Sequence, residues 1–279
     1  NASGTGALAV KGGSYKQGAN VTLASSDPAP GARCFKLQSV GKHVRLVNTR
    51  TYQAVAVKGA SAQDGANVVQ TRMSSSKAQL WTPSINRDGS ISFKNAASGK
   101  MLARTSGSAN VVQKAAGASS SKAWRLKAVK RYSLSGNTKL DKGLAGILAT
   151  HSTLRSAYNC IRDDYKWDSP DTAYRSGKYM SDDNTKRYAL QMIKRGKGSC
   201  YCTSSTVMWL ARALGYDADV TVGYLYSNIP GVIGAHSWVE VRKGGVAYVC
   251  DADCERGLPG HDFFMKRYPE TPAEYHFWE

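Results

Sequence analysis

The residues with the clearest chemical potential lie in the C-terminal half of the chain, where a cysteine opens a predicted helix. Cys200 follows Gly198 and Ser199, and the next residues, YCTSSTVMWLARALG, place apolar side chains on one helical face and end at Gly215. Ser199 is the expected N-cap residue. The unpaired amides and dipole of a helix N-terminus stabilise a thiolate. The pattern therefore predicts a reactive thiol at Cys200.

A β-hairpin is predicted downstream, because two runs of alternating residues flank the turn at 243–245. The position of the turn decides which carboxylate faces His236. A turn at 243–244 places Asp251 directly opposite His236, within reach of a hydrogen bond. A turn one residue later places Asp253 there instead. We expect Asp251 to be the partner, with Asp253 as the alternative.

Cys200, His236 and Asp251 together have the types and order of a nucleophile, a base and an orienting acid. A carboxylate on one imidazole nitrogen fixes the tautomer, so that the other nitrogen can accept the thiol proton. The set predicts attack on a carboxamide or peptide carbonyl, with a thioester intermediate that water or an amine resolves. We expect hydrolysis, and the sequence leaves amine transfer open.

Three segments carry a family resemblance: GSCYCTSSTVMWLARALGYDADVTVGY, AHSWVEV and VAYVCDAD. They resemble the transglutaminase-like superfamily over residues 143–255. In that family the nucleophile lies fifteen residues before the glycine that closes its helix, which selects Cys200 over Cys202. The resemblance implies an α+β fold of the papain/transglutaminase-like kind and a thiol enzyme. Ala247 departs from the family, which often has tryptophan there.

Apolar residues upstream of Cys200 recur at helical spacing and predict a helical lead-in: Leu144, Ile147, Leu148, Leu154, Tyr158 and Ile161. Residues 168–183 then form a polar stretch that predicts a loop, either at the surface or along a cleft.

The first half of the chain is repetitive. Gly18-Ala19-Asn20-Val21 recurs twice, at 65–68 and, with serine first, at 108–111. Each copy follows a short apolar run and precedes an aromatic residue: Phe35, Trp81 or Trp124. Periods of this length with short apolar runs predict three repeats of strands that share one core.

These repeats resemble the ricin-type β-trefoil lectin family, whose Q-x-W signature matches Gln79-Leu80-Trp81. The resemblance implies carbohydrate binding. The sugar sites of that family usually carry an aspartate where this chain has Ala9, Ala56 and Ala103. We therefore expect a multidomain protein with an all-β trefoil at 1–128, a linker at 129–142 and the α+β domain at 143–279.

Positive charge is concentrated in the predicted trefoil. Of the formal net charge of +18, residues 1–128 contribute +15, from 18 Lys or Arg against 3 Asp or Glu. Such a field attracts polyanions. We expect a protein or peptide substrate and a glycan or anionic cell-wall polymer as partners, rather than nucleic acid. No stretch approaches the roughly 20 apolar residues of a membrane span, and we expect a secreted or cell-surface protein of bacterial origin.

Two further interpretations compete with the enzyme. The transglutaminase-like fold could be inactive, in which case the chain is a non-catalytic carbohydrate or cell-surface binding protein. Alternatively, four thiols could hold zinc: Cys200, Cys202, Cys250 and Cys254. The enzyme interpretation requires no cofactor and no metal.

Overall fold

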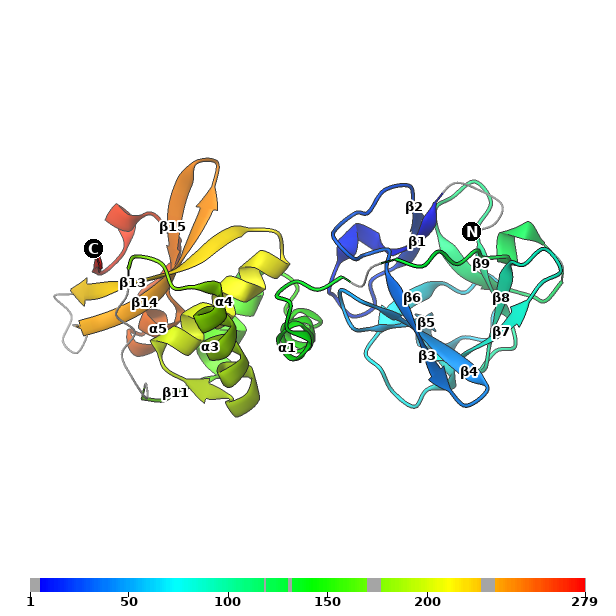
Figure 1. Cartoon of the computed structure of the whole chain (residues 1–279), viewed down its shortest axis with the longest axis horizontal. Coiled ribbons are helices and arrows are strands. Elements are labelled where there is room, and N and C mark those ends of the chain that lie inside the picture. The colour runs from blue at the N-terminus through cyan, green and yellow to red at the C-terminus, as the bar shows by residue number, and fades with distance from the viewer. Residues whose placement is uncertain (1–5, 118, 130–131, 170–176, 227–233, 279) are drawn as a thin grey trace. The chain divides into compact units, whose positions relative to one another are not determined.

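The computed structural model describes two compact units, Asn1–Ser133 and Leu134–Glu279 (Figure 1), within residues 6–117, 119–129, 132–169, 177–226 and 234–278. The predicted loop at 168–183 lies partly outside these residues, at 170–176. The second unit begins with helix α1 (Thr138–Leu148), so helical structure extends into the segment that the sequence assigned to a linker.

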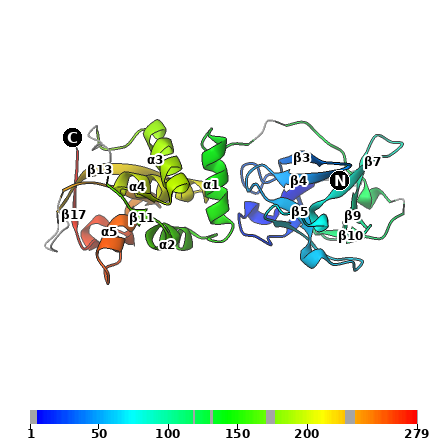
Figure 2. The same cartoon turned by 90° about the horizontal axis from the view of Figure 1, so that it is seen from below.

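The first unit is built from short antiparallel strands in three repeats, which confirms the predicted trefoil (Figure 2). The apolar runs of the sequence form β1, β5 and β9, and each pairs with the next strand, β2, β6 or β10. The strands are β1 (Ala7–Val10), β2 (Val21–Ala24), β3 (Phe35–Val40), β4 (His43–Asn48), β5 (Ala54–Val57), β6 (Val68–Thr71), β7 (Trp81–Ile85), β8 (Ile91–Asn95), β9 (Met101–Arg104) and β10 (Val111–Lys114).

The aromatic residues of the repeats meet in one core. Trp81 and Trp124 are buried in it, and Phe35 packs against it while partly buried. The indole N–H of Trp81 donates to the carbonyl of Val55, and that of Trp124 donates to the carbonyl of Leu102, both at 3.0 Å. Each indole therefore packs in the core and also satisfies its polar atom on a strand of its own repeat.

The asparagine of each repeated motif closes a ring of hydrogen bonds. Asn67 donates to Asn20 at 2.5 Å, Asn20 to Asn110 at 2.7 Å, and Asn110 to Asn67 at 3.0 Å. One amide per repeat thus both donates and accepts, which ties the three repeats together around their common axis. This ring is the structural reason for the asparagine of the repeated motif, whereas the valines that follow it lie in the hydrophobic core.

The second unit packs helices against a five-stranded antiparallel sheet in the order β16-β15-β14-β13-β17 (Figure 1). Its helices after α1 are α2 (Leu154–Asp164), α3 (Asp182–Arg195), α4 (Cys200–Ala213) and α5 (Ala252–Gly257). The sheet strands are β13 (Asp217–Tyr226), β14 (Gly234–Lys243), β15 (Val246–Cys250), β16 (Phe264–Lys266) and β17 (Glu274–Phe277), and a separate parallel pair is formed by β11 (Lys166–Trp167) and β12 (Lys197–Gly198). Helix α4 is buried along almost its whole length and packs on β13 and β14.

The predicted register of the hairpin is wrong. Strand β14 pairs Val239 with Cys250, so the turn residues are Gly244 and Gly245. Both glycines have positive φ, 60° and 78°, as a two-residue turn of the primed type requires. Lys243 at a turn position would have to adopt a positive φ, which is strained for a residue with a Cβ atom. Two adjacent glycines therefore move the turn by one residue.

None of the helices in the described ranges is both long enough and apolar enough to span a membrane.

Candidate active site

Cys200 is the first residue of α4, and 9% of its surface is exposed. Ser199 precedes it at the N-cap position with an extended backbone, but its side chain forms no capping hydrogen bond. Cys202 is fully buried and packs on Gly198, where an added Cβ would lie 2.5 Å from the Cβ of Cys202. Gly198 therefore makes room for Cys202. Cys200 is the thiol that faces the site.

His236 on β14 lies between Cys200 and Asp251. Its Nε2 is 2.8 Å from Oδ2 of Asp251. The sulfur of Cys200, a ring nitrogen of His236 and a carboxylate oxygen of Asp253 all lie within 4.8 Å of one another. Because Nε2 is engaged by Asp251, Nδ1 is the nitrogen that remains for the thiol. The structure thus brings all the sequence-selected side chains, the alternative Asp253 included, around one imidazole.

The contact between Asp251 and His236 does not arise from strand pairing. Asp251 directly follows β15 and forms the N-cap of α5, accepting from the amide of Cys254 at 3.0 Å. The same carboxylate accepts from the Tyr275 hydroxyl at 3.0 Å. The turn from strand into helix aims the carboxylate at the imidazole, so the pair forms although the two residues are not opposite each other in the hairpin.

The electrostatics favour a charged His236–Asp251 pair. Burial by itself would raise the pKa of Asp251, but the charge and hydrogen bond of His236 hold it below its usual value. Burial would likewise lower the pKa of His236, but the charge and hydrogen bond of Asp251 raise it well above 6.5. A buried carboxylate that accepts several hydrogen bonds stabilises an imidazolium in this way.

Two further groups lie next to His236. The sequence suggested Cys254 only as a possible zinc ligand and Asp253 only as the alternative carboxylate. The thiol of Cys254 lies 3.4 Å from Nε2 of His236, and burial raises its pKa to about 12, so it is a neutral thiol near neutral pH. Asp253 is bound to Arg256, and burial raises the pKa of its carboxyl. Cys254 follows the N-cap residue Asp251 by three positions, and this spacing brings its amide and side chain back toward Asp251. The spacing is the feature of the sequence that could have indicated Cys254.

The four-thiol zinc site is not formed. Among the described residues, two groups near His236 could hold a metal. One is Cys200 with His236 and Asp253, and the other is Cys254 with His236 and Asp251. Cys202 and Cys250 belong to neither group. Residues 200 and 202 point to different sides of α4, and 250 and 254 are separated by the change from strand to helix.

Aromatic and acidic side chains fix the part of β14 that follows His236. Trp238 is fully buried and stacks on His236 with an interplanar angle of 17°. Its indole N–H donates to the Tyr268 hydroxyl at 3.0 Å, and that hydroxyl donates to Glu240 at 2.9 Å. The tryptophan and glutamate of the H-x-W-V-E-V pattern thus fix the strand that carries His236.

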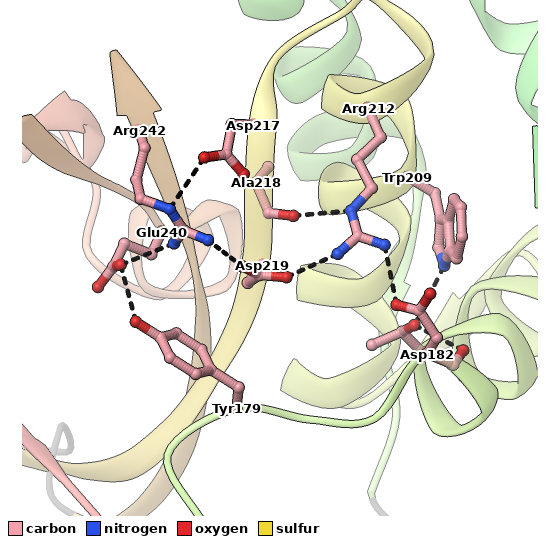
Figure 3. A network of polar contacts seen from close by, with 10 residues as sticks. Tyr179, Asp182, Trp209, Arg212, Asp217, Ala218, Asp219, Glu240 and Arg242 are labelled. Carbon is pink, nitrogen blue, oxygen red and sulfur yellow. Dashed lines mark hydrogen bonds and ion pairs between the residues drawn. The ribbon is translucent and has the colours of Figure 1, made fainter. Parts of the chain in front are cut away.

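A network of ion pairs joins the same strand to α4 (Figure 3). Asp219 on β13 accepts from Arg212 of α4 at 2.6 Å and also pairs with Arg242 of β14. Arg242 binds Glu240 at 3.0 Å, and Arg212 reaches Asp182 at the start of α3 at 2.8 Å. The network therefore links the helix that begins with Cys200 to the strand that carries His236.

Comparisons with known proteins agree with this architecture. The model of the ricin-type β-trefoil lectin domain-like family matches residues 34–118, and that of the transglutaminase-like superfamily matches residues 139–250. A search of the curated proteins returned no match.

Several solved structures are similar to this chain. ThreeFoil, a designed threefold symmetric protein, is 31% identical, with a TM-score of 0.41 over 44% of this chain and 90% of that one. An exo-β-1,3-galactanase from Clostridium thermocellum is 22% identical, with a TM-score of 0.41 over 44% of this chain and 27% of that one. A Polyporus squamosus lectin is 16% identical, with a TM-score of 0.38 over 88% of this chain and 86% of that one. By the two family models, the chain joins a ricin-type β-trefoil lectin-like domain to a C-terminal domain of the transglutaminase-like superfamily.

Proposed function

We propose that the second unit is a thiol enzyme that acts on peptide or carboxamide bonds, with Cys200 as nucleophile, His236 as base and Asp251 as the residue that orients the base. The observation that carries this proposal is the 2.8 Å contact between His236 and Asp251, with Cys200 at the start of α4 on the same imidazole. Membership of the transglutaminase-like superfamily supports the same class of chemistry.

The geometry supports the following steps. His236 takes the proton of Cys200, and the thiolate sulfur attacks the carbonyl carbon of the substrate. The N-terminal end of α4, where Cys200 lies, carries the positive end of the helix dipole and can stabilise the oxyanion. As the intermediate collapses, the C–N bond breaks and His236 returns the proton to the leaving amine, which leaves a thioester on Cys200. Water or a second amine then gives up a proton to His236 and attacks this thioester, which releases the acyl group and restores the thiol. Asp251 stabilises the imidazolium that forms in each half-reaction.

Water is the acceptor that we favour, which makes the enzyme a peptidase or amidase. Transfer to an amine proceeds through the same thioester and differs only in the second step. The two outcomes are therefore distinguished by the product and not by the residues of the site.

The trefoil unit is proposed to hold the enzyme on a glycan or an anionic surface outside the cell. Its family supports carbohydrate binding. Ala9, Ala56 and Ala103 replace the carboxylates that would accept sugar hydroxyls, and all three are buried. The charge of +15 over residues 1–128 supports an anionic polymer as the ligand.

The proposed reaction can be tested with a library of peptides and carboxamides, incubated with and without a primary amine. We expect the native chain to form products and Cys200→Ala to form none. Cys34→Ser, which alters a cysteine of the trefoil unit, is the matched control and should retain activity. Turnover by Cys200→Ala equal to that of the native chain would reject Cys200 as the nucleophile.

A further inference from the structure

A second cluster of metal-ligating side chains lies on α2, away from the proposed active site. One ligand atom each of His151, Cys160 and Asp164 lies within 4.8 Å of the other two. Cys160 and Asp164 are four residues apart on α2, which places them on one face of that helix. His151 comes from the connection between α1 and α2, so the cluster joins two elements.

The imidazole of His151 is held in an orientation suited to ligation. Its Nδ1 lies 3.0 Å from the hydroxyl oxygen of Ser156, and its backbone amide donates to the carbonyl of Ile147 at 2.9 Å. If Nδ1 carries the proton and donates to Ser156, the lone pair of Nε2 is free. Histidines that bind metals commonly have their other ring nitrogen hydrogen-bonded in this manner.

The cluster opens onto a surface pocket of about 510 Å³ that is lined by all three residues. Cys160 is 8% exposed, whereas Asp164 is exposed. The side-chain oxygen of Asn159, which also lines the pocket, is buried without a hydrogen-bond partner. An ion in this pocket would therefore meet a thiol, an imidazole and a carboxylate and still have room for water.

The charges around the cluster do not oppose a cation. Arg155 lines the same pocket, but its guanidinium binds Asp262 at 3.0 Å and lies over the ring of Phe264. Within the described ranges, Asp164 takes part in no ion pair, and its carboxylate interacts with the thiol of Cys160. Burial, together with this carboxylate, raises the pKa of Cys160 to about 12, so the thiol keeps its proton until a cation replaces it.

We propose that His151, Cys160 and Asp164 form a binding site for Zn²⁺ or a similar divalent transition metal, with its fourth position open to the pocket. A thiolate, an imidazole and a carboxylate are all ligands that zinc accepts, and three protein ligands with one open position are a recurrent arrangement. Binding releases the proton of Cys160 to solvent, and sulfur, nitrogen and oxygen then coordinate the ion. This site is independent of the activity proposed for Cys200.

Co²⁺ is a spectroscopic probe of such a site, because a cobalt–thiolate bond gives a charge-transfer absorption. The experiment uses the full chain with Cys200→Ala and Cys254→Ala, which removes both sulfurs of the two potential metal groups around His236. We expect one Co²⁺ per chain with a thiolate band that Zn²⁺ abolishes by displacement. Adding Cys160→Ser removes the band, whereas adding Cys34→Ser leaves it intact.

Zn²⁺ titration calorimetry on the same background gives a second readout. We expect His151→Ala to weaken Zn²⁺ binding by more than about 100-fold, because even groups that only orient a ligand are worth 10–100-fold. Ser156→Ala, which removes the hydrogen bond to Nδ1, should weaken it by about 10-fold. If Cys160→Ser fails to fold, the His151 and Ser156 variants decide. Absence of the band in the chain with Cys200→Ala and Cys254→Ala, or unchanged affinity after His151→Ala, would overturn the proposal.

Discussion

Nε2 of His236 and Oδ2 of Asp251 lie 2.8 Å apart, although the two residues are not paired across the hairpin that connects them. The contact forms because β15 ends at Cys250 and Asp251 turns the chain into α5. The strand ladder positions His236, and the cap of the helix positions Asp251. The relationship between base and carboxylate therefore depends on a helix start as much as on a sheet.

The two aspartates near His236 should differ in their effect on catalysis. Asp251→Asn removes the charge that supports the imidazolium, and we expect kcat to fall by about 10² to 10⁴. Asp253→Asn removes a carboxyl that is bound to Arg256, and we expect a change below about tenfold. Steady-state kinetics on a substrate found in the library measure both variants. A larger loss for Asp253→Asn than for Asp251→Asn would assign the orienting role to Asp253.

The stability contributed by the His236–Asp251 pair should depend on pH. The pKa of His236 is raised well above 6.5, so its contribution is complete below about pH 6.5 and is lost as the pH rises through the raised pKa. The pKa of Asp251 is lowered from 3.8, so its contribution is present above about pH 4 and is lost as the pH falls through the lowered pKa. The destabilisation by Asp251→Asn should therefore be largest between these limits.

Chemical denaturation of the native and Asp251→Asn chains, at about pH 5.5 and about pH 9.5, measures this dependence. The difference in the unfolding free energy of the second unit should be smaller at the higher pH. A difference that stays constant, or grows toward high pH, would show that His236 is not charged by its contact with Asp251.

The cysteines of the second unit should differ in reactivity. Cys160, Cys250 and Cys254 each have a pKa raised to about 12 by burial, so almost none of their thiols is ionised near pH 7. Cys200 lies beside His236 at the N-terminus of α4, and we expect iodoacetamide to label it first. Peptide mapping by mass spectrometry identifies the labelled residue. Labelling of Cys254 as fast as that of Cys200 would mean that two thiols compete for the imidazole.

Asp219 should matter more for stability than its neighbour Asp217. It joins Arg212 of α4 to Arg242 of β14, and its side chain is 27% exposed (Figure 3). We expect Asp219→Asn to destabilise the second unit by about 1–3 kcal/mol, because it weakens two charge-assisted hydrogen bonds. Asp217 is 68% exposed, and Asp217→Asn should cost less than about 1 kcal/mol. Thermal denaturation of both variants tests the difference, and equal losses would remove the special role of Asp219.

Binding by the trefoil unit should be sensitive to salt. If its positive charge is the basis of recognition, an immobilised anionic polysaccharide retains the chain at low ionic strength. About 1 M salt should release it, because the Debye length then falls to about 3 Å. A neutral polysaccharide matrix is the control and should not retain the chain. Salt-insensitive retention that a free sugar displaces would instead indicate a carbohydrate pocket, despite the alanines at 9, 56 and 103.

Much of the architecture could be predicted from local patterns. The repeated Ala-Asn-Val and the aromatic residue of each repeat predict three copies of one strand unit, because strands and shared cores depend on residues close in sequence. The apolar face of residues 200–214 predicts α4, since helical periodicity is visible in a short window. The same patterns indicated which residues carry the chemistry and which family they resemble.

The tertiary structure decided what depends on the path of the chain between elements. The turn at Gly244-Gly245 set the register against the prediction, because moving the turn by one residue shifts every cross-strand partner by two, which keeps the alternation of faces but changes every pair. The sequence had no means to place Asp251 at a helix cap facing His236, or Cys254 at 3.4 Å from the same nitrogen. Nor did it relate His151 to Cys160 and Asp164. Residue types and spacing determine elements, whereas the convergence of side chains depends on how those elements begin, end and pack, which is a property of the whole fold.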